Sequence, residues 1–190
     1  MSLSQKLFFK LNAQLGKRVW FDRLMYLSAN LLIYILAFFV VSWGVFVLGE
    51  INPDKFEMMI KMLLTTFVFS FTISYGIALL WKHPRPIVEF PKTKMLLYPI
   101  EVWKSFPSDH TSMSFLLAGI VVIMGGGLNF SIFVILLATI IAFSRVYVGV
   151  HYPRDIVGGF LLALILLFSA NWLLTNITQP LYTLLTHLIS

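Results

Sequence analysis

Residues 144–155 carry charged and titratable side chains between two long apolar stretches. The segment contains Arg145, His151, Arg154 and Asp155. A charged group within or near a bilayer is costly unless it is paired or hydrated. The segment therefore indicates a functional site, and the alternative is a basic loop that anchors two helices at the membrane surface.

Two further polar segments, residues 82–86 and 105–110, have the same character. Together with residues 144–155 they hold all but one of the 4 histidines of the chain. The candidate site residues in the three segments are Lys82, Arg85, Ser108, Asp109, His110, Arg145, His151 and Asp155.

The cations in this set favour an oxyanion such as phosphate. Arg85 and Arg145 can each bind phosphate in bidentate fashion, and Lys82 adds a point charge. Ser108 follows Pro107 and begins an apolar stretch, which predicts the N-cap of a helix. The free N–H groups of the next turn would then point toward the same phosphate.

The two histidines beside these cations suit phosphate-ester hydrolysis. Of His110 and His151, one can attack phosphorus while the other protonates the leaving oxygen. Asp155 lies four residues after His151, so its carboxylate can hold the imidazole tautomer and stabilise the imidazolium.

A metal centre is the alternative use of the same residues. His110, His151, Asp109 and Asp155 could bind zinc or iron. The cluster contains more cations than carboxylates, however, and the arginines would repel a divalent ion. We therefore expect no metal and no other cofactor.

The composition is that of an integral membrane protein. Of 190 residues, 59% are hydrophobic and 12% are charged, and the mean hydropathy is +0.89, whereas soluble proteins carry about 25% charged residues. The absence of cysteine excludes disulfides and thiolate chemistry. The net charge of +6 favours anionic headgroups or a phosphate-bearing substrate over nucleic acid.

The hydropathy pattern predicts an all-α bundle of about five transmembrane helices in one membrane domain, residues 1–190. We expect an amphipathic interfacial segment at 1–23, interrupted near Gly16 and without a cleavable signal peptide, and a short tail at 180–190. His83 is expected at the interface and His187 in the tail. The expected spans lie within 24–179, at 24–49, 62–81, 108–125, 129–148 and 156–179.

This order of spans places the polar segments on one side of the membrane. The connections 82–107 and 144–155 follow the second and fourth spans, and residues 107–110 begin the third. All candidate residues should therefore meet at one end of the bundle.

At these residues the chain resembles the type 2 phosphatidic acid phosphatase superfamily of membrane lipid phosphatases. The family motifs are Lys-x6-Arg-Pro, Pro-Ser-Gly-His and Ser-Arg-x5-His-x3-Asp. The first is half present, since Arg85-Pro86 match but Ala78 stands at the position of the lysine. The second reads Pro-Ser-Asp-His at 107–110, with Asp109 for glycine. The third is matched by Ser144, Arg145, His151 and Asp155.

The resemblance implies metal-independent hydrolysis through a phosphohistidine on His151, with His110 as the general acid. It assigns the phosphate to Arg85, Ser108 and Arg145, and we group Asp109 of the second motif with these phosphate-binding residues.

Lys82 is a candidate for the missing lysine. It lies four residues after Ala78, so on a continuing helix it would occupy the same face one turn later. The alternative is that Lys82 is a plain interfacial anchor.

Within the family, residues 105–110 and 144–153 resemble bacterial undecaprenyl-diphosphate phosphatases, which implies recycling of the polyprenyl carrier of cell-wall synthesis. A phosphatase for phosphatidate, phosphatidylglycerophosphate or lipid A phosphates is the enzymatic alternative. A protein that only binds or transports lipid phosphates is the third possibility. The intact His110, His151 and Asp155 argue against it, since binding alone needs only cations.

The orientation in the membrane raises a conflict. The basic N-terminal segment lies on the side of the candidate site, which the positive-inside rule would place in the cytoplasm. The resemblance implies a site on the outer face of the plasma membrane. Phosphate accounts for the two arginines, whereas Lys92, Lys94 and Lys104 have no explanation in the sequence. We expect the outward-facing site.

Overall fold

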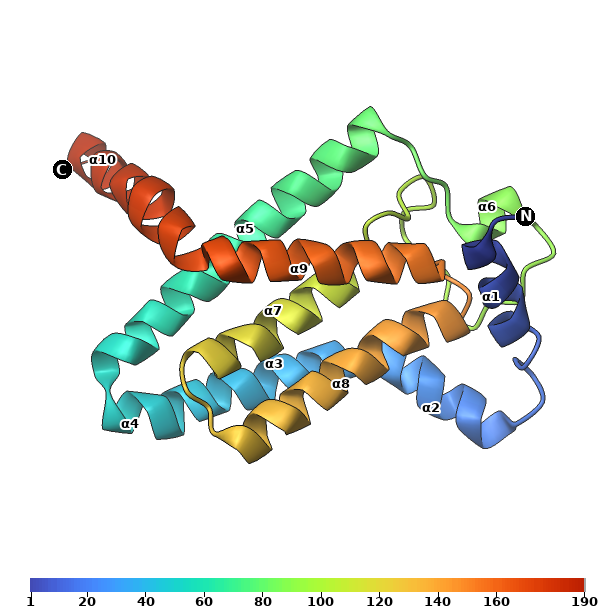
Figure 1. Cartoon of the computed structure of the whole chain (residues 1–190), viewed down its shortest axis with the longest axis horizontal. Helices are drawn as coiled ribbons and strands as arrows, with labels where there is room; N and C mark the ends of the chain where they lie inside the picture. Colours follow the sequence, from blue (N-terminus) through green and yellow to red (C-terminus); the bar gives the residue numbers. More distant parts are fainter. Residues whose placement is uncertain (190) are drawn as a thin grey trace.

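The computed structural model describes residues 1–189, and no strand occurs among them (Figure 1). The predicted all-α fold is confirmed. In chain order the helices are α1 (Leu3–Asn12), α2 (Val19–Asn30), α3 (Leu32–Trp43), the π-helical turn η1 (Gly44–Leu48), α4 (Gly49–Ile51), α5 (Pro53–Leu80), α6 (Pro86–Glu89), α7 (Asp109–Ile123), α8 (Leu128–Tyr147), α9 (Pro153–Leu173), the π-helical turn η2 (Leu174–Thr178) and α10 (Gln179–Ile189).

The bundle contains helices that match a membrane in length and polarity, and a fifth apolar helix, α7, is shorter at 15 residues. Phe46, Leu64 and Phe168 are exposed on the sides of these helices, where lipid would cover them. The expected bundle of about five membrane helices is confirmed. The 4 stretches that are long and apolar enough to span are Leu32–Ile51, Pro53–Leu80, Leu128–Tyr147 and Pro153–His187.

Three predicted boundaries differ from the structure. The first span begins at Leu32 instead of residue 24, because the helix is interrupted at Leu31 and residues before it belong to α2. The second span begins at Pro53 instead of residue 62, because α5 continues through the charged residues between 54 and 61. The last helix does not stop at Pro180. This proline lies in the first turn of α10, and the chain passes through η2 into α10 up to Ile189; Ser190 lies outside the described residues.

α7 lies at the centre of the bundle and packs against α3, α5, α8 and α9 (Figure 1). The core between these helices contains Val40, Met59, Ile120 and Ile141, which are fully buried. Because neighbours surround α7, the position of its first turn is fixed by packing on several sides.

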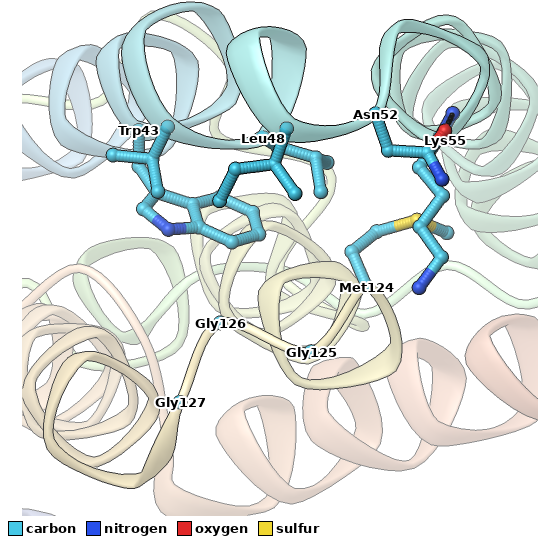
Figure 2. A pocket seen from close by; sticks show the side chains of 10 residues that line it. Trp43, Leu48, Asn52, Lys55, Met124, Gly125, Gly126 and Gly127 are labelled. Atoms are coloured by element: carbon cyan, nitrogen blue, oxygen red, sulfur yellow. Dashed lines mark hydrogen bonds between the residues drawn. The ribbon is translucent and has the colours of Figure 1, made fainter.

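A cavity of about 330 Å³ lies where α7 turns into α8, lined by Trp43, Asn52, Lys55 and Met124 among others (Figure 2). The turn is formed by the glycines at 125–127, as predicted. This end of the bundle contains none of the candidate histidines or arginines, so the phosphate chemistry lies elsewhere.

Candidate active site

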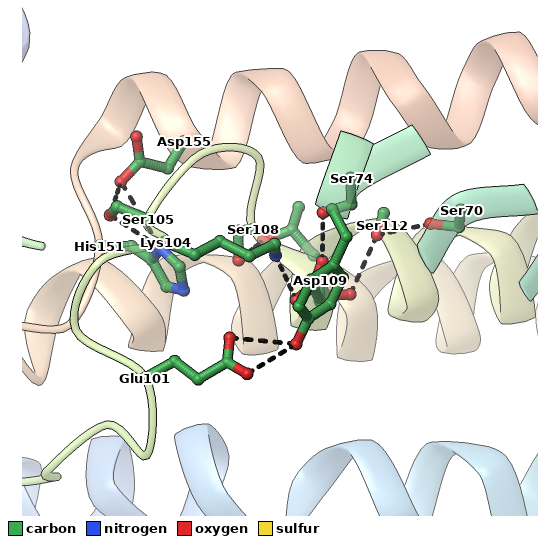
Figure 3. Close-up of polar contacts among 12 residues, drawn as sticks. Ser70, Ser74, Glu101, Lys104, Ser105, Ser108, Asp109, Ser112, His151 and Asp155 are labelled. Carbon is green, nitrogen blue, oxygen red and sulfur yellow. Dashed lines mark hydrogen bonds and ion pairs between the residues drawn. The ribbon is translucent and has the colours of Figure 1, made fainter. Parts of the chain in front are cut away.

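The three polar segments meet at the other end of the bundle, as the order of the spans predicts. Arg85 precedes α6, Ser105 lies in the connection before α7, and His151 lies between α8 and α9 (Figures 1 and 3). Nη1 of Arg85 is 3.0 Å from the carbonyl oxygen of Val150 and 3.1 Å from Nε2 of His151.

Arg85 and Asp155 determine the tautomer of His151. A guanidinium only donates, so Nε2 presents a lone pair and the ring proton resides on Nδ1. Nδ1 is 3.5 Å from Oδ2 of Asp155 and 3.4 Å from Oγ of Ser105. The same carboxylate oxygen accepts hydrogen bonds from the Ser105 hydroxyl at 2.5 Å and from the Tyr152 N–H at 2.8 Å. The imidazole therefore offers an unprotonated Nε2, as a nucleophile requires.

Burial keeps His151 neutral. The residue is 3% exposed, and loss of hydration lowers the pKa of the imidazole to about 4. The hydrogen bond that His151 donates to Asp155 opposes this effect, and the charge of Arg85 adds to it. At neutral pH Nε2 therefore carries no proton, and its lone pair faces Arg85.

Backbone hydrogen bonds place Arg85 and Ser105 in the site. The Arg85 N–H donates to the carbonyl of Val102 at 3.0 Å, and the Ser105 N–H donates to the carbonyl of His83 at 2.8 Å. Nε of Arg85 also donates to the carbonyl of Glu101 at 2.5 Å. Burial lowers the pKa of Arg85, but a guanidinium remains charged in proteins. The site thus contains a cation whose position is set by several carbonyls.

The first turn of α7 faces the same place. Ser108 is its N-cap residue, as predicted, and Oγ of Ser108 accepts a hydrogen bond from the Thr111 hydroxyl at 3.1 Å. The Ser108 N–H donates to the carbonyl of Asp155 at 3.0 Å, which joins α7 to α9. Gly159 permits this approach, because a Cβ atom there would lie 2.5 Å from the Ser108 carbonyl oxygen. The remaining N–H groups of the turn can bind an anion.

Arg145 and His110 complete the group. Arg145 is buried in α8 and donates from Nη1 to the carbonyl of Ala29 at 2.7 Å, while its Nε has no hydrogen-bond partner among the described residues. A buried donor without a partner is costly, and a phosphate oxygen would satisfy it. Arg85, Arg145 and Lys104 all act electrostatically on His110. Positive charge therefore surrounds the histidines, which suits an anionic substrate.

The alternative metal site is not formed by these side chains. In the part of the chain that the structure describes, no three His, Asp or Glu residues gather closely enough to hold an ion. His151 and Asp155 are engaged with each other and Ser105, whereas Asp109 pairs with Lys104. Independence of metal stays a prediction.

The sequence of residues 59–179 matches the pattern of the PAP2 superfamily. The chain belongs to this superfamily. The protein is accordingly a multi-pass membrane protein of a lipid phosphatase family.

Similar proteins include two named for the same lipid. The "Putative undecaprenyl-diphosphatase YbjG" of Escherichia coli (strain K12) is 30% identical over 182 residues, which cover 95% of this chain and 87% of that protein. The "Undecaprenyl-diphosphatase BcrC" of Bacillus subtilis (strain 168) is 28% identical over 134 residues, 70% of this chain and 66% of that protein.

One further relative and one solved structure are also similar to this chain. The "Bacitracin transport permease protein BcrC" of Bacillus licheniformis is 26% identical over 165 residues, which cover 86% of this chain and 77% of that protein. The crystal structure of Aquifex aeolicus LpxE shares the fold, with a TM-score of 0.67 and 24% identity over 90% of this chain and 95% of that chain.

The helix that carries Ala78 does not continue to Lys82, so the predicted placement of Lys82 one helical turn after Ala78 is wrong. α5 ends one residue before Trp81, whose backbone is extended at φ −140° and ψ 94°. The side chain of Lys82 is exposed. Lys104 is instead only 3% exposed at the site, and its amine lies 2.6 Å from Oδ2 of Asp109 (Figure 3).

Four polar residues of this region are not among the candidates predicted from the sequence: Tyr75, Glu101, Lys104 and Ser105. The Tyr75 hydroxyl is 3.0 Å from both carboxylate oxygens of Glu101, and the amine of Lys104 lies 4.7 Å from the centre of the Tyr75 ring. Ser105 belongs to the polar segment 105–110, so its position beside the second motif was a usable signal. The other three lie outside the family motifs, and no local pattern marks them.

The N-terminal helix α1 is hydrogen-bonded to residues next to the site. Oγ of Ser4 accepts a hydrogen bond from the Arg154 N–H at 3.1 Å, and the Gln5 amide donates to Glu89 at 2.6 Å. The second carboxylate oxygen of Glu89 accepts from the Tyr152 hydroxyl at 2.7 Å. The segment predicted to lie in the interface thus also braces the residues next to His151.

Proposed function

We propose that the protein hydrolyses undecaprenyl diphosphate to undecaprenyl phosphate and inorganic phosphate through a phosphohistidine on His151. The observation that carries this proposal is the setting of the imidazole, with Nδ1 held by Asp155 and Ser105 and Nε2 only 3.1 Å from Arg85. The names of YbjG and of the B. subtilis BcrC support the choice of lipid.

In the first half-reaction, Nε2 of His151 attacks the terminal phosphorus. The bond from phosphorus to the bridging oxygen breaks, and His110 donates a proton to that oxygen as undecaprenyl phosphate leaves. Arg85, Arg145 and Ser108 bind the oxygens of the phosphoryl group, where negative charge is concentrated in the transition state.

In the second half-reaction, water attacks the phosphohistidine. His110, now neutral, takes a proton from that water, the N–P bond breaks, and inorganic phosphate is released. Asp155 stabilises the positive charge that His151 carries while it is bonded to phosphorus. Both histidines then return to their starting states.

The test is phosphate release by detergent-purified protein from a panel of lipid phosphates. We expect the highest kcat/KM with undecaprenyl diphosphate and undiminished turnover in excess EDTA. Higher kcat/KM with phosphatidate, phosphatidylglycerophosphate or a lipid A phosphate would assign the enzyme to that substrate. Loss of turnover in EDTA that one divalent ion restores would overturn the metal-free mechanism.

A lipid-phosphate binder or transporter is the second candidate. The B. licheniformis relative is named as a transport permease, although for bacitracin. Such a protein would bind members of the panel and release no phosphate from any of them. The pairing of His151 with Asp155 argues for hydrolysis, because binding alone has no use for an oriented imidazole.

We also propose that the site faces the outside of the plasma membrane. Two of the three lysines that the sequence left unexplained have partners within the fold, which reduces the conflict with the positive-inside rule. The amine of Lys94 donates to the carbonyl of Leu15 at 3.2 Å, and that of Lys104 pairs with Asp109. Lys92 remains as an exposed basic residue.

A further inference from the structure

Lys104 is a buried cation that the mechanism above does not use. Its amine is bound to Oδ2 of Asp109 at 2.6 Å, and Oδ1 of the same carboxylate accepts a hydrogen bond from the Ser74 hydroxyl at 2.5 Å. An ammonium group has three N–H donors, so the pair with Asp109 leaves donors for another acceptor. Burying a charge carries a desolvation penalty, so a purely structural role for Lys104 would lower the stability of the fold.

The position of Lys104 relates it to the general acid. Asp109, to which it is bound, directly precedes His110 in the first turn of α7, and Lys104 acts electrostatically on His110. Figure 3 shows Asp155 on one side of His151 and the amine of Lys104 toward the other side, over the start of α7. Asp155 thus lies on the Nδ1 side of His151, and the amine of Lys104 lies away from Asp155, beside the first turn of α7.

We propose that Lys104 binds the phosphate that stays with the lipid, and that it thereby selects diphosphates over monophosphates. This inference rests on the proposed attack by His151 on the terminal phosphate. In a diphosphate the leaving group is itself a phosphate and needs a cation, whereas the leaving group of a monophosphate is an alcohol that needs only the proton from His110.

The contacts of Lys104 hold its amine in place before substrate arrives. The side chain lies against the Tyr75 ring at 4.7 Å, and the hydroxyl of that ring is bonded to Glu101. Asp109 neutralises the charge of Lys104, and the Ser74 hydroxyl donates a hydrogen bond to Asp109. Because the rotamer freedom of a lysine is already restricted, less entropy is lost when phosphate binds.

The absence of the PAP2 lysine at Ala78 fits this arrangement. Ala78 is 1% exposed, so no cation extends from this position of α5. Lys104 reaches the site from the connection before α7, and Asp109 takes the place of the motif glycine that would leave it without a partner. Asp109 is then a positioning residue for Lys104 and not itself a ligand of the phosphate.

The test compares farnesyl diphosphate with farnesyl phosphate, which differ by one phosphate on the same short lipid. Lys104→Met should lower kcat/KM for the diphosphate by roughly tenfold to a hundredfold, the value of a charge-assisted hydrogen bond. For the monophosphate the change should stay within about threefold. Lys104→Arg should retain most of the preference, and Lys92→Met, which removes an exposed lysine of the same connection, should leave the ratio unchanged.

Lys104→Met leaves the Asp109 carboxylate without its cation, which destabilises the fold. The double variant Lys104→Met/Asp109→Asn also removes the charge of the carboxylate and serves as the second variant. Thermal unfolding in detergent identifies which of the two is folded, and the same change in the substrate ratio is expected. An equal loss for both substrates, or no loss for either, in a folded variant overturns the inference. Wild-type protein that hydrolyses neither substrate would instead contradict the proposed phosphatase function itself.

Discussion

Because His151 is buried, its imidazole has a lower pKa than a histidine in water. The pKa is lowered to about 4, because desolvation disfavours the imidazolium more than Asp155 favours it. We expect the ring resonances of His151 to titrate near pH 4 in NMR spectra of protein labelled at histidine. Their assignment follows from their loss in His151→Gln. A midpoint near 6.5 would mean that half of the nucleophile is charged close to neutral pH.

The same shift makes stability depend on pH. A histidine whose pKa is lower in the folded protein than in the unfolded chain stabilises the fold fully above the unfolded value of 6.5. This contribution is lost as the pH falls through 6.5 toward about 4, since the unfolded chain binds the proton more readily. Melting temperatures in detergent should therefore fall across this interval, and less so in His151→Gln.

The two histidines have different roles that can be separated by trapping the intermediate. His151→Ala removes the nucleophile and should leave no phosphoenzyme and essentially no turnover. His110→Ala should form the intermediate slowly and hydrolyse it more slowly still, with a loss of about 10²–10⁴ in rate. The measurement is acid-labile, base-stable phosphate on the protein after rapid quench with labelled substrate, with para-nitrophenyl phosphate to reduce the need for an acid.

Trapped phosphate in His151→Ala together with none in His110→Ala would reverse the assignment. Asp155→Asn serves as the intermediate case, since it weakens the orientation of the imidazole and leaves the cations untouched. Ser105→Ala tests the orientation of the same imidazole, because it removes the hydrogen bond that the Ser105 hydroxyl donates to the Asp155 carboxylate at 2.5 Å.

The sequence identifies those site residues that lie at fixed spacings along one segment. His151 and Asp155 are four apart, so their contact follows from local geometry. Lys104 and Tyr75 could not be found in this way. Their contact depends on the path of the long connection after α5, which no periodicity records.

Close packing of two elements determines how the site is assembled. Gly159 of α9 lies against the start of α7, where an added Cβ would be 2.5 Å from the Ser108 carbonyl oxygen. Gly159→Ala should lower stability by about 1–3 kcal/mol through overpacking. It should also lower kcat, because the helices that carry Ser108 and Asp155 must separate.

The control for this substitution is Gly76→Ala in α5, where a Cβ would meet nothing within 4 Å. Alanine is the better helix former, so stability should be unchanged or slightly higher. The comparison uses thermal unfolding and phosphate release. Equal melting temperatures for the two variants would show that α7 and α9 tolerate more separation than the packing suggests.

Hydropathy locates the membrane helices well and their ends poorly. The apolar stretches are readable because a bilayer demands a minimum length of them. The end at Pro180 was misplaced because a proline in the first turn of a helix lacks only an N–H that would have no partner there. The turns η1 and η2 have no signature in the sequence, since a π-helical turn adds a residue without changing its polarity.

At the scale of the whole molecule, the proposed orientation places the active site on the outside of the membrane, and cysteine labelling tests it. The chain has no cysteine, so a single introduced cysteine reports one position. Lys92→Cys lies at the end with the active site and Lys55→Cys near the opposite end, and both positions are exposed. An impermeant maleimide added to intact cells should label Lys92→Cys and should label Lys55→Cys only after lysis. The reverse pattern would place the site in the cytoplasm.

The brace formed by α1 sets an order for biosynthesis. Ser4 is bonded to a residue 150 positions later, Arg154, and Asn12 is bonded to the carbonyl of Lys94, 82 positions later. The ribosome delivers the first helix long before these partners exist, and α9 comes last of the helices around the site. A nascent chain that stalls before α9 can insert most of its spans but has neither Asp155 nor a completed brace. Enzymatic competence is therefore acquired only when synthesis is nearly finished.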